Sequence, residues 1–125
     1  MNFASDDLDA LQRVFQQCWD VSESKRWHEP GIHDGIERKT SATERLFLVV
    51  SELVEAMEEL RDGRGFQEIY YSEGGKPEGF PIEMADAVIR IGDLITEHKV
   101  PILEAMAIKQ RYNQTRPIRH GGKTL

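Results

Sequence analysis

Apolar residues recur at three- and four-residue spacing along most of this 125-residue chain, and no stretch alternates between apolar and polar residues as a strand would. This periodicity predicts four amphipathic helices, at about 5–22, 42–61, 82–98 and 101–113. Ser41 and Glu44 have the spacing of a capping box before the second helix, and Pro81 and Pro101 suit the first turns of the third and fourth. The chain is therefore predicted to be a single all-α domain over 1–125, with its helices arranged like a four-helix bundle.

The second predicted helix has the clearest apolar stripe, formed by Leu46, Val49, Val50, Leu53, Met57 and Leu60. Two connections, at about 23–40 and 63–80, are long for a compact bundle, and loops of such length are often functional. Beyond about Gln114 the chain is expected to be irregular.

Charge is distributed unevenly along the chain. The formal net charge is −6, but residues 1–104 contain 22 acidic and 11 basic residues, whereas 105–125 contain five basic residues and no acidic one. The acidic balance argues against polymeric nucleic acid as a partner. The longest apolar run, 46–50, is too short to span a membrane, and a lone Cys18 excludes a disulfide framework. The acidic N-terminus has no signal-peptide character, so we expect a cytoplasmic protein.

Acidic residues occur in two closely spaced pairs on consecutive predicted helices. Glu52 and Glu55 lie in the second helix, and Glu83 and Asp86 lie in the third. A spacing of three places both carboxylates of a pair on one helix face, and four converging carboxylates would suit Mg²⁺ or Mn²⁺, which take oxygen ligands. The alternative is a solvated polar face on each helix, because every amphipathic helix has one.

The surroundings of these pairs resemble a known family. The segments SELVEAMEELRDG, PIEMADAVIRIGDL and KQRYNQTRPIRHGGK, with 27 residues between the two acidic pairs, are similar to the signature of MazG-like nucleotide pyrophosphohydrolases, members of the all-α NTP pyrophosphatase superfamily. The resemblance extends from about Trp27 to Lys123. It implies a MazG-type fold and cleavage of a ribo- or deoxyribonucleoside triphosphate between its α- and β-phosphates, which releases the monophosphate and pyrophosphate.

The same resemblance implies roles for the acidic residues. The two pairs would hold Mg²⁺, with Mn²⁺ as the alternative, and would thereby bind the triphosphate. A neighbouring acid, Glu59 or Glu58, would orient the attacking water.

The basic C-terminal segment, 105–125, would bind the nucleotide. The resemblance implies that Lys109, Asn113 and Arg116 contact the nucleotide. Tyr112 and Arg119 are further candidates for contact with it. The alternative for these cations is that they complement a helix C-terminus or are simply solvated, which is the expectation for Lys123.

Two tryptophans are predicted to differ in role. Trp27 lies in a loop, where it would either stack on the nucleotide base or pack over the end of the bundle. Trp19 lies on an apolar helix face and is predicted to belong to the core. His28 is expected to be a surface residue, as an isolated loop histidine usually is.

Other enzyme classes lack their motifs in this sequence. There is no Glu-x-x-His of a di-iron carboxylate bundle, no P-loop, and no supporting motif for a Ser or Cys hydrolase. The remaining alternative is a catalytically inactive, dimeric helical module that binds nucleotides or other proteins. Four helices of this length make a thin core, so we expect a homodimer or higher homo-oligomer in which a second subunit could help to build the site.

Overall fold

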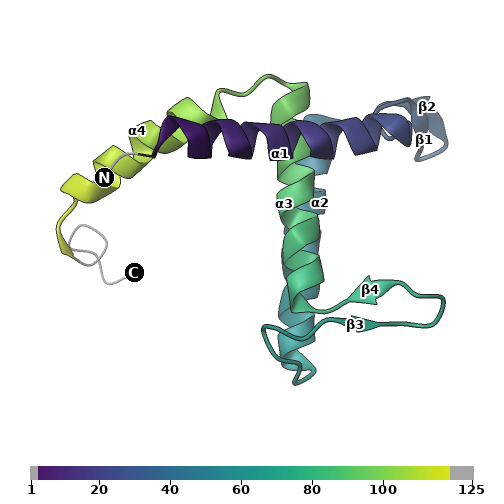
Figure 1. The fold of residues 1–125 in the computed structure, drawn as a ribbon. Helices are drawn as coiled ribbons and strands as arrows, with labels where there is room; N and C mark the ends of the chain where they lie inside the picture. Colours follow the sequence, from purple (N-terminus) through teal and green to yellow (C-terminus); the bar gives the residue numbers. More distant parts are fainter. Residues whose placement is uncertain (1–2, 119–125) are drawn as a thin grey trace.

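The computed structural model describes residues 3–118 and contains four α-helices and two short β-hairpins in that range (Figure 1). The helices are α1 (Ser5–Ser24), α2 (Ala42–Arg61), α3 (Phe80–Glu97) and α4 (Ile102–Thr115). Each helix end lies within two residues of its predicted position. The mostly helical character predicted from the periodicity is therefore confirmed.

Ser41 of the predicted capping box forms the N-cap of α2. The Ser41 side chain accepts a hydrogen bond from the backbone N–H of Glu44 at 3.1 Å. This bond satisfies one of the backbone donors that a helix N-terminus leaves unpaired. It determines where α2 begins and hence the position of the acidic pair further along that helix.

The two long connections contain strands, which the periodicity did not predict. β1 (Gly31–His33) pairs with β2 (Ile36–Arg38), and β3 (Tyr70–Tyr71) pairs with β4 (Pro77–Glu78), both antiparallel. Asp34 and Gly35 form the first turn with φ of 53° and 77°, and Asp-Gly is a preferred sequence for such a two-residue hairpin turn. Strands of two or three residues are too short to produce a recognisable alternation, which is why the prediction missed them.

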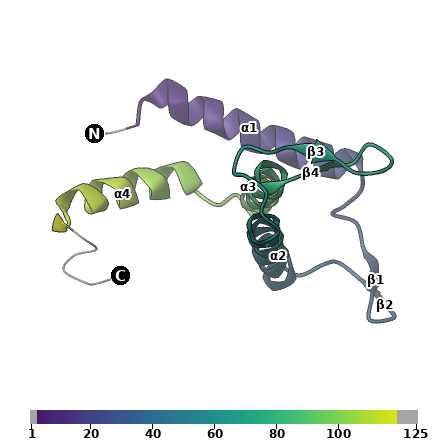
Figure 2. The ribbon, with the colours of Figure 1, turned by 90° about the horizontal axis from the view of Figure 1, so that it is seen from below.

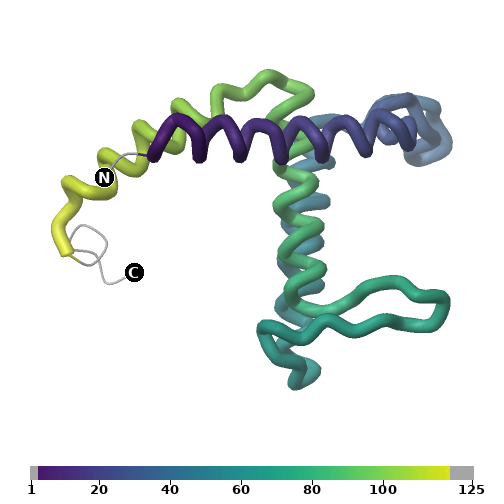
Figure 3. The backbone as a smooth tube through the Cα atoms, viewed as in Figure 1, coloured from purple at the N-terminus to yellow at the C-terminus, as the bar shows by residue number. Residues whose placement is uncertain are grey.

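Helices α2 and α3 pack against each other in antiparallel orientation (Figures 1 and 3). At one end of the pair, Arg45 of α2 lies 2.9 Å from Asp93 of α3 and also pairs with Glu97. Between the helices, the small residues Ala56 and Ala87 are buried. The two acidic pairs lie on these helices, so the antiparallel packing determines how they face each other.

Helix α1 crosses α3 at a glycine (Figure 1). The side chain of Phe15 is buried at this crossing, and a Cβ added at Gly92 would lie only 2.5 Å from the Phe15 Cδ1 atom. Because Gly92 has no side chain, α1 approaches α3 closely enough to pack directly against it.

Helix α4 extends away from the α2–α3 pair and makes no extensive contact with the other helices of residues 3–118 (Figure 2). Much of the apolar stripe of α2 is also uncovered: Val49 is buried, but Val50 and Leu53 are 52% and 45% exposed, and the adjacent Phe47 is 69% exposed. The helices of one chain therefore do not close into a four-helix bundle.

Within residues 3–118, no helix combines the length and the hydropathy needed to cross a bilayer.

Candidate metal centre and adjoining cavity

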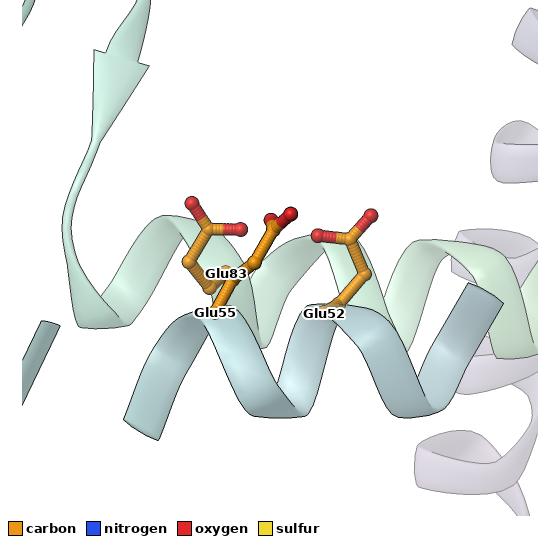
Figure 4. Close-up of side chains that lie close together, drawn as sticks. All are labelled: Glu52, Glu55 and Glu83. Atoms are coloured by element: carbon orange, nitrogen blue, oxygen red, sulfur yellow. The ribbon is translucent and has the colours of Figure 1, made fainter. Parts of the chain in front are cut away.

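Three of the four predicted metal-ligating acids converge between α2 and α3. Glu52 and Glu55 come from α2 and Glu83 comes from α3, and each offers a carboxylate oxygen such that the three atoms lie within 4.8 Å of one another. Figure 4 shows the three side chains rising to the same side of the two helices. The three-residue spacing on α2 and the antiparallel packing of α3 together produce this arrangement.

The protonation of these acids reflects their crowding. Burial, hydrogen bonding to Glu55 and Glu52, and the negative charge of both raise the pKa of Glu83 to about 8. Burial also disfavours ionisation of Glu52, but hydrogen bonds from Arg90 and from Glu83 outweigh it and lower the pKa of Glu52. Burial and the two neighbouring carboxylates therefore favour a proton on one acid of the cluster, and Arg90 supplies too little positive charge to offset them.

Asp86, the fourth predicted ligand, does not belong to the group within 4.8 Å. It nevertheless interacts electrostatically with that group. Burial and the charges of Glu52 and Glu55 raise the pKa of Asp86, whereas the charges of Arg90 and Lys76 act to lower it. It also lines the same cavity as Glu52. The structure thus brings Glu52, Glu55 and Glu83 together and places Asp86 beside them.

This donor set fits a divalent cation. Hard cations such as Mg²⁺ and Mn²⁺ bind carboxylate oxygens, and they would supply the positive charge whose shortage keeps Glu83 protonated. Exposed acidic residues often converge without holding an ion, but Glu52 is only 7% exposed. A buried carboxylate is costly unless it is paired with a cation or a hydrogen-bond donor.

One cation already pairs with the cluster. The Nε of Arg90 donates a hydrogen bond to Oε1 of Glu52 at 2.8 Å. Arg90 follows Asp86 by four residues on α3, so it lies on the same helix face one turn further along. That spacing was visible in the sequence, but the ion pair to α2 was not.

A cavity of about 640 Å³ adjoins the acidic cluster. Its two sides differ in chemistry: one contains the acidic and basic side chains of α2 and α3, and the other contains the largely apolar face of α1. The lining residues are Val14, Gln17, Cys18, Val21, Ser22, Trp27, Glu52, Asp86, Ile89, Arg90 and Asp93. The cavity is large enough for an organic ligand that is charged at one end and aromatic or apolar at the other.

Trp27, predicted as a base-stacking residue, lines this cavity and is 66% exposed. It is therefore available to a ligand rather than packed in the core. Trp19, predicted to belong to the core, is only partly buried and stacks on the ring of His28 with 5.5 Å between ring centroids.

His28 is not the surface residue that was expected. Its side chain is 9% exposed, its Nδ1 lies 2.8 Å from Glu23 and its Nε2 lies 2.8 Å from Asp93. Burial alone would lower the pKa of His28, but the hydrogen bonds to the two carboxylates raise it. The prediction was wrong because Asp93 lies 65 residues away in the sequence, and no local pattern connects it to His28.

Glu59 and Glu58, predicted to orient water, have partners of their own. The hydroxyl of Tyr70 donates to both carboxylate oxygens of Glu59, at 2.8 and 3.0 Å, and Arg64 lies 3.4 Å from the same carboxylate. Glu58 pairs with Arg61 on the helix surface. Neither belongs to the group of acids within 4.8 Å of one another, so their predicted role stays a prediction.

Two basic residues, Lys109 of α4 and Arg116 directly after it, lie over the ring of Tyr112. The Nζ of Lys109 lies 4.8 Å from the centre of the Tyr112 ring, and the guanidinium of Arg116 lies 5.8 Å from it. Asn113 lies on the same helix, and its side chain is exposed. Arg119 and Lys123 lie outside the described residues.

No residue of α4 lines the cavity beside the acidic cluster. The predicted phosphate-binding residues and the predicted metal ligands are therefore separate within residues 3–118 of one chain.

Three residues near the site were not predicted: Arg90, Asp93 and Cys18. Arg90 and Asp93 lie on a polar face of α3, and Cys18 lies among apolar residues of α1. The periodicity correctly describes these faces, but it does not reveal that α1 crosses α3 and forms a cavity with it.

Comparison of the chain with protein-family models, with curated proteins and with solved structures finds no match in any of the three.

Proposed function

We propose that this protein is a nucleotide pyrophosphohydrolase that depends on a divalent cation and cleaves a nucleoside triphosphate between its α- and β-phosphates. The proposal rests chiefly on one observation: two carboxylate pairs on neighbouring helices bring three acids within 4.8 Å of one another, beside a cavity that adjoins them. The resemblance of the surrounding segments to MazG-like enzymes supports the same activity and a MazG-type fold.

In this proposal Glu52, Glu55, Glu83 and Asp86 hold Mg²⁺, or Mn²⁺ in its place. When bound, the cation makes a water molecule easier to deprotonate and offsets negative charge on the phosphoryl oxygens. A bound cation would favour the ionised form of the Glu83 carboxyl, whose pKa is raised without it. The acids therefore form the site only in their fully ionised state.

Other residues bind and orient the substrate. The indole of Trp27 stacks on the base at the cavity, where its ring is exposed. Glu59, which is held by the Tyr70 hydroxyl one helical turn beyond Glu55, orients the attacking water. The products are a nucleoside monophosphate and pyrophosphate.

We further propose that the protein works as a homodimer or a higher homo-oligomer. The uncovered apolar stripe of α2 and the separation of α4 from the cavity support this assembly. A second chain would cover the stripe and complete a helical bundle, and its own Lys109, Tyr112, Asn113, Arg116 and Arg119 would approach the phosphates. The reaction would thus take place in a cytoplasmic oligomer with a free nucleotide as substrate.

The alternative is a helical module that keeps the fold but has no activity. The presence of all four acids and of a cavity beside them favours the enzyme, because a module that only binds partners has no need for crowded carboxylates.

A product assay decides between the two. We expect the protein with Mg²⁺ to convert members of a panel of NTPs and dNTPs to monophosphate and pyrophosphate, separated by ion-exchange chromatography. Glu52→Gln and Asp86→Asn should each lower turnover more than about 100-fold with helicity unchanged, since loss of even an outer partner of a metal ligand costs about 10- to 100-fold. Glu73→Gln, on an exposed loop, is the matched control and should act like wild type.

Two results would contradict the enzyme. Absence of turnover with both Mg²⁺ and Mn²⁺ would support the inactive module. Normal turnover in Glu52→Gln would mean that the carboxylates are not the ligands.

A further inference from the structure

Arg90 pairs with an acid of the cluster, Glu52, through a single nitrogen. It uses only Nε to reach Glu52, and its two terminal nitrogens have no hydrogen-bond or ion-pair partner within residues 3–118. Its side chain is 42% exposed and lines the 640 Å³ cavity, whereas its partner Glu52 has a side chain only 9% exposed. The guanidinium is therefore anchored at one nitrogen and faces open space with the other two.

Arg45 provides the contrast within the same pair of helices. Its two terminal nitrogens both bind acids, Asp93 and Glu97, and its side chain is 16% exposed. Both terminal nitrogens of Arg45 are thus occupied by carboxylates, as expected for a structural ion pair. Arg90 has only one nitrogen paired with a carboxylate, so breaking its contact with Glu52 costs less free energy than breaking the contacts of Arg45.

We infer that Arg90 is an exchangeable counter-ion, which neutralises Glu52 while the cluster is without a cation and binds the phosphates of the substrate once a cation has taken its place. The inference rests on the proposed function, since it assumes that Glu52 is a cation ligand. Beyond that function, the exchange couples the binding of the cation to the binding of phosphate through the side chain of Arg90.

The coupling follows from the charges involved. A guanidinium and a divalent cation compete for the same buried carboxylate, and the cation repels the guanidinium when both are near it. Arg90 then turns its unpaired nitrogens to the cavity, where a phosphate chain brings negative charge. A planar guanidinium binds phosphate oxygens through two parallel hydrogen bonds, which makes it better suited to this task than an ammonium group.

The exchange predicts that Arg90→Gln, made in the full chain, changes the affinities for Mn²⁺ and for inorganic triphosphate in opposite directions. Mn²⁺ binding alone, followed by calorimetry, should be about five- to tenfold tighter in Arg90→Gln than in wild type, because a competing positive charge is removed. Binding of inorganic triphosphate at saturating Mn²⁺ should be about tenfold or more weaker in Arg90→Gln, because the donors to phosphate are lost.

Two further variants sharpen the test. Arg90→Lys keeps the charge but not the planar group, so its Mn²⁺ affinity should stay near wild type while its triphosphate affinity falls. Arg38→Gln is the matched control: Arg38 of β2 is also 2.8 Å from a glutamate, Glu44, and its side chain is 37% exposed, but Glu44 is not among the clustered acids. Both affinities of Arg38→Gln should equal those of wild type.

Unchanged or weaker Mn²⁺ binding in Arg90→Gln, with helicity intact, would overturn the exchange. Glu52→Gln identifies which idea has failed. If Glu52→Gln weakens Mn²⁺ binding and Arg90→Gln leaves it unchanged, the exchange is wrong and the cation site stands. If Glu52→Gln also leaves Mn²⁺ binding unchanged, both the cation site and the exchange are wrong.

Discussion

Glu83 shows how the electrostatics of a single residue connect stability with ligand binding. Its carboxyl is partly buried between two other acids, and these surroundings raise its pKa from 4.5 to about 8. An unfolded chain separates the three acids and returns Glu83 to its ordinary pKa. Over the interval between these two values, the Glu83 carboxyl therefore binds a proton in the folded, cation-free protein that it does not bind in the unfolded chain.

This difference predicts the direction of a pH dependence. Where the folded state binds more protons than the unfolded state, the free energy of unfolding falls as pH rises. We expect the cation-free protein to lose stability from pH 4.5 to about 8, and Glu83→Gln to lose less over the same range, since glutamine does not titrate. Urea unfolding at several pH values, with chelator present, measures both slopes. Equal slopes in the two proteins would contradict the assignment of the proton to Glu83.

Contacts between individual residues could be predicted from the sequence where spacing along a helix alone brings the residues together. Glu52 and Glu55 share a helix face because three residues separate them, and Arg90 follows Asp86 by four. The contacts of His28 with Glu23 and Asp93 depend on how the loop after α1 folds back on α3, which spacing does not encode.

Among the secondary-structure elements, the crossing of α1 over α3 depends on Gly92. The helix passes so close that even one methyl group would meet the ring of Phe15, with only 2.5 Å between the added Cβ and Cδ1. A glycine in a helix interior costs about 1 kcal/mol relative to alanine, so its presence here reflects the packing.

We therefore expect Gly92→Ala to destabilise the protein, although alanine favours the helix. Overpacking of this kind costs about 1–3 kcal/mol, which should exceed the gain in helix propensity. Gly65→Ala is the control, because nothing lies within 4 Å of an added Cβ and the backbone there is not left-handed. Chemical denaturation compares the two variants, and a Gly92→Ala protein as stable as wild type would show that the crossing is looser than described.

The helices could be predicted because capping residues and apolar periodicity act locally, as at Ser41. The hairpins could not be predicted from periodicity, since their strands have only two or three residues. Asp34-Gly35 is a local signal for the first hairpin, but a turn sequence leaves no trace in apolar periodicity.

For the molecule as a whole, most of the apolar stripe of α2 is exposed within residues 3–118, although Val49 is buried. Periodicity predicts which face of a helix is apolar, but the same pattern arises whether its own chain or a second copy covers that face. This is why the helices were predicted correctly while a closed bundle did not form within the chain.

The proposed assembly predicts the effect of a charge in the stripe. We expect wild type to be a dimer or larger by light scattering, and Val50→Asp to shift it towards monomer, because a carboxylate would be buried without a partner. Val100→Asp, at an exposed site between α3 and α4, should leave the oligomeric state unchanged. A monomeric wild type at micromolar concentration would contradict the assembly.

The cavity has one further consequence for how such a protein can change. Its carboxylates come from α2 and α3, whereas five of its lining residues come from α1. Substitutions on α1, such as at Val14 or Gln17, alter the shape and hydrogen bonding offered to a ligand without touching Glu52 or Asp86. In the proposed enzyme, ligand selectivity and catalysis are thus assigned to different helices, so substitutions can change one without changing the other.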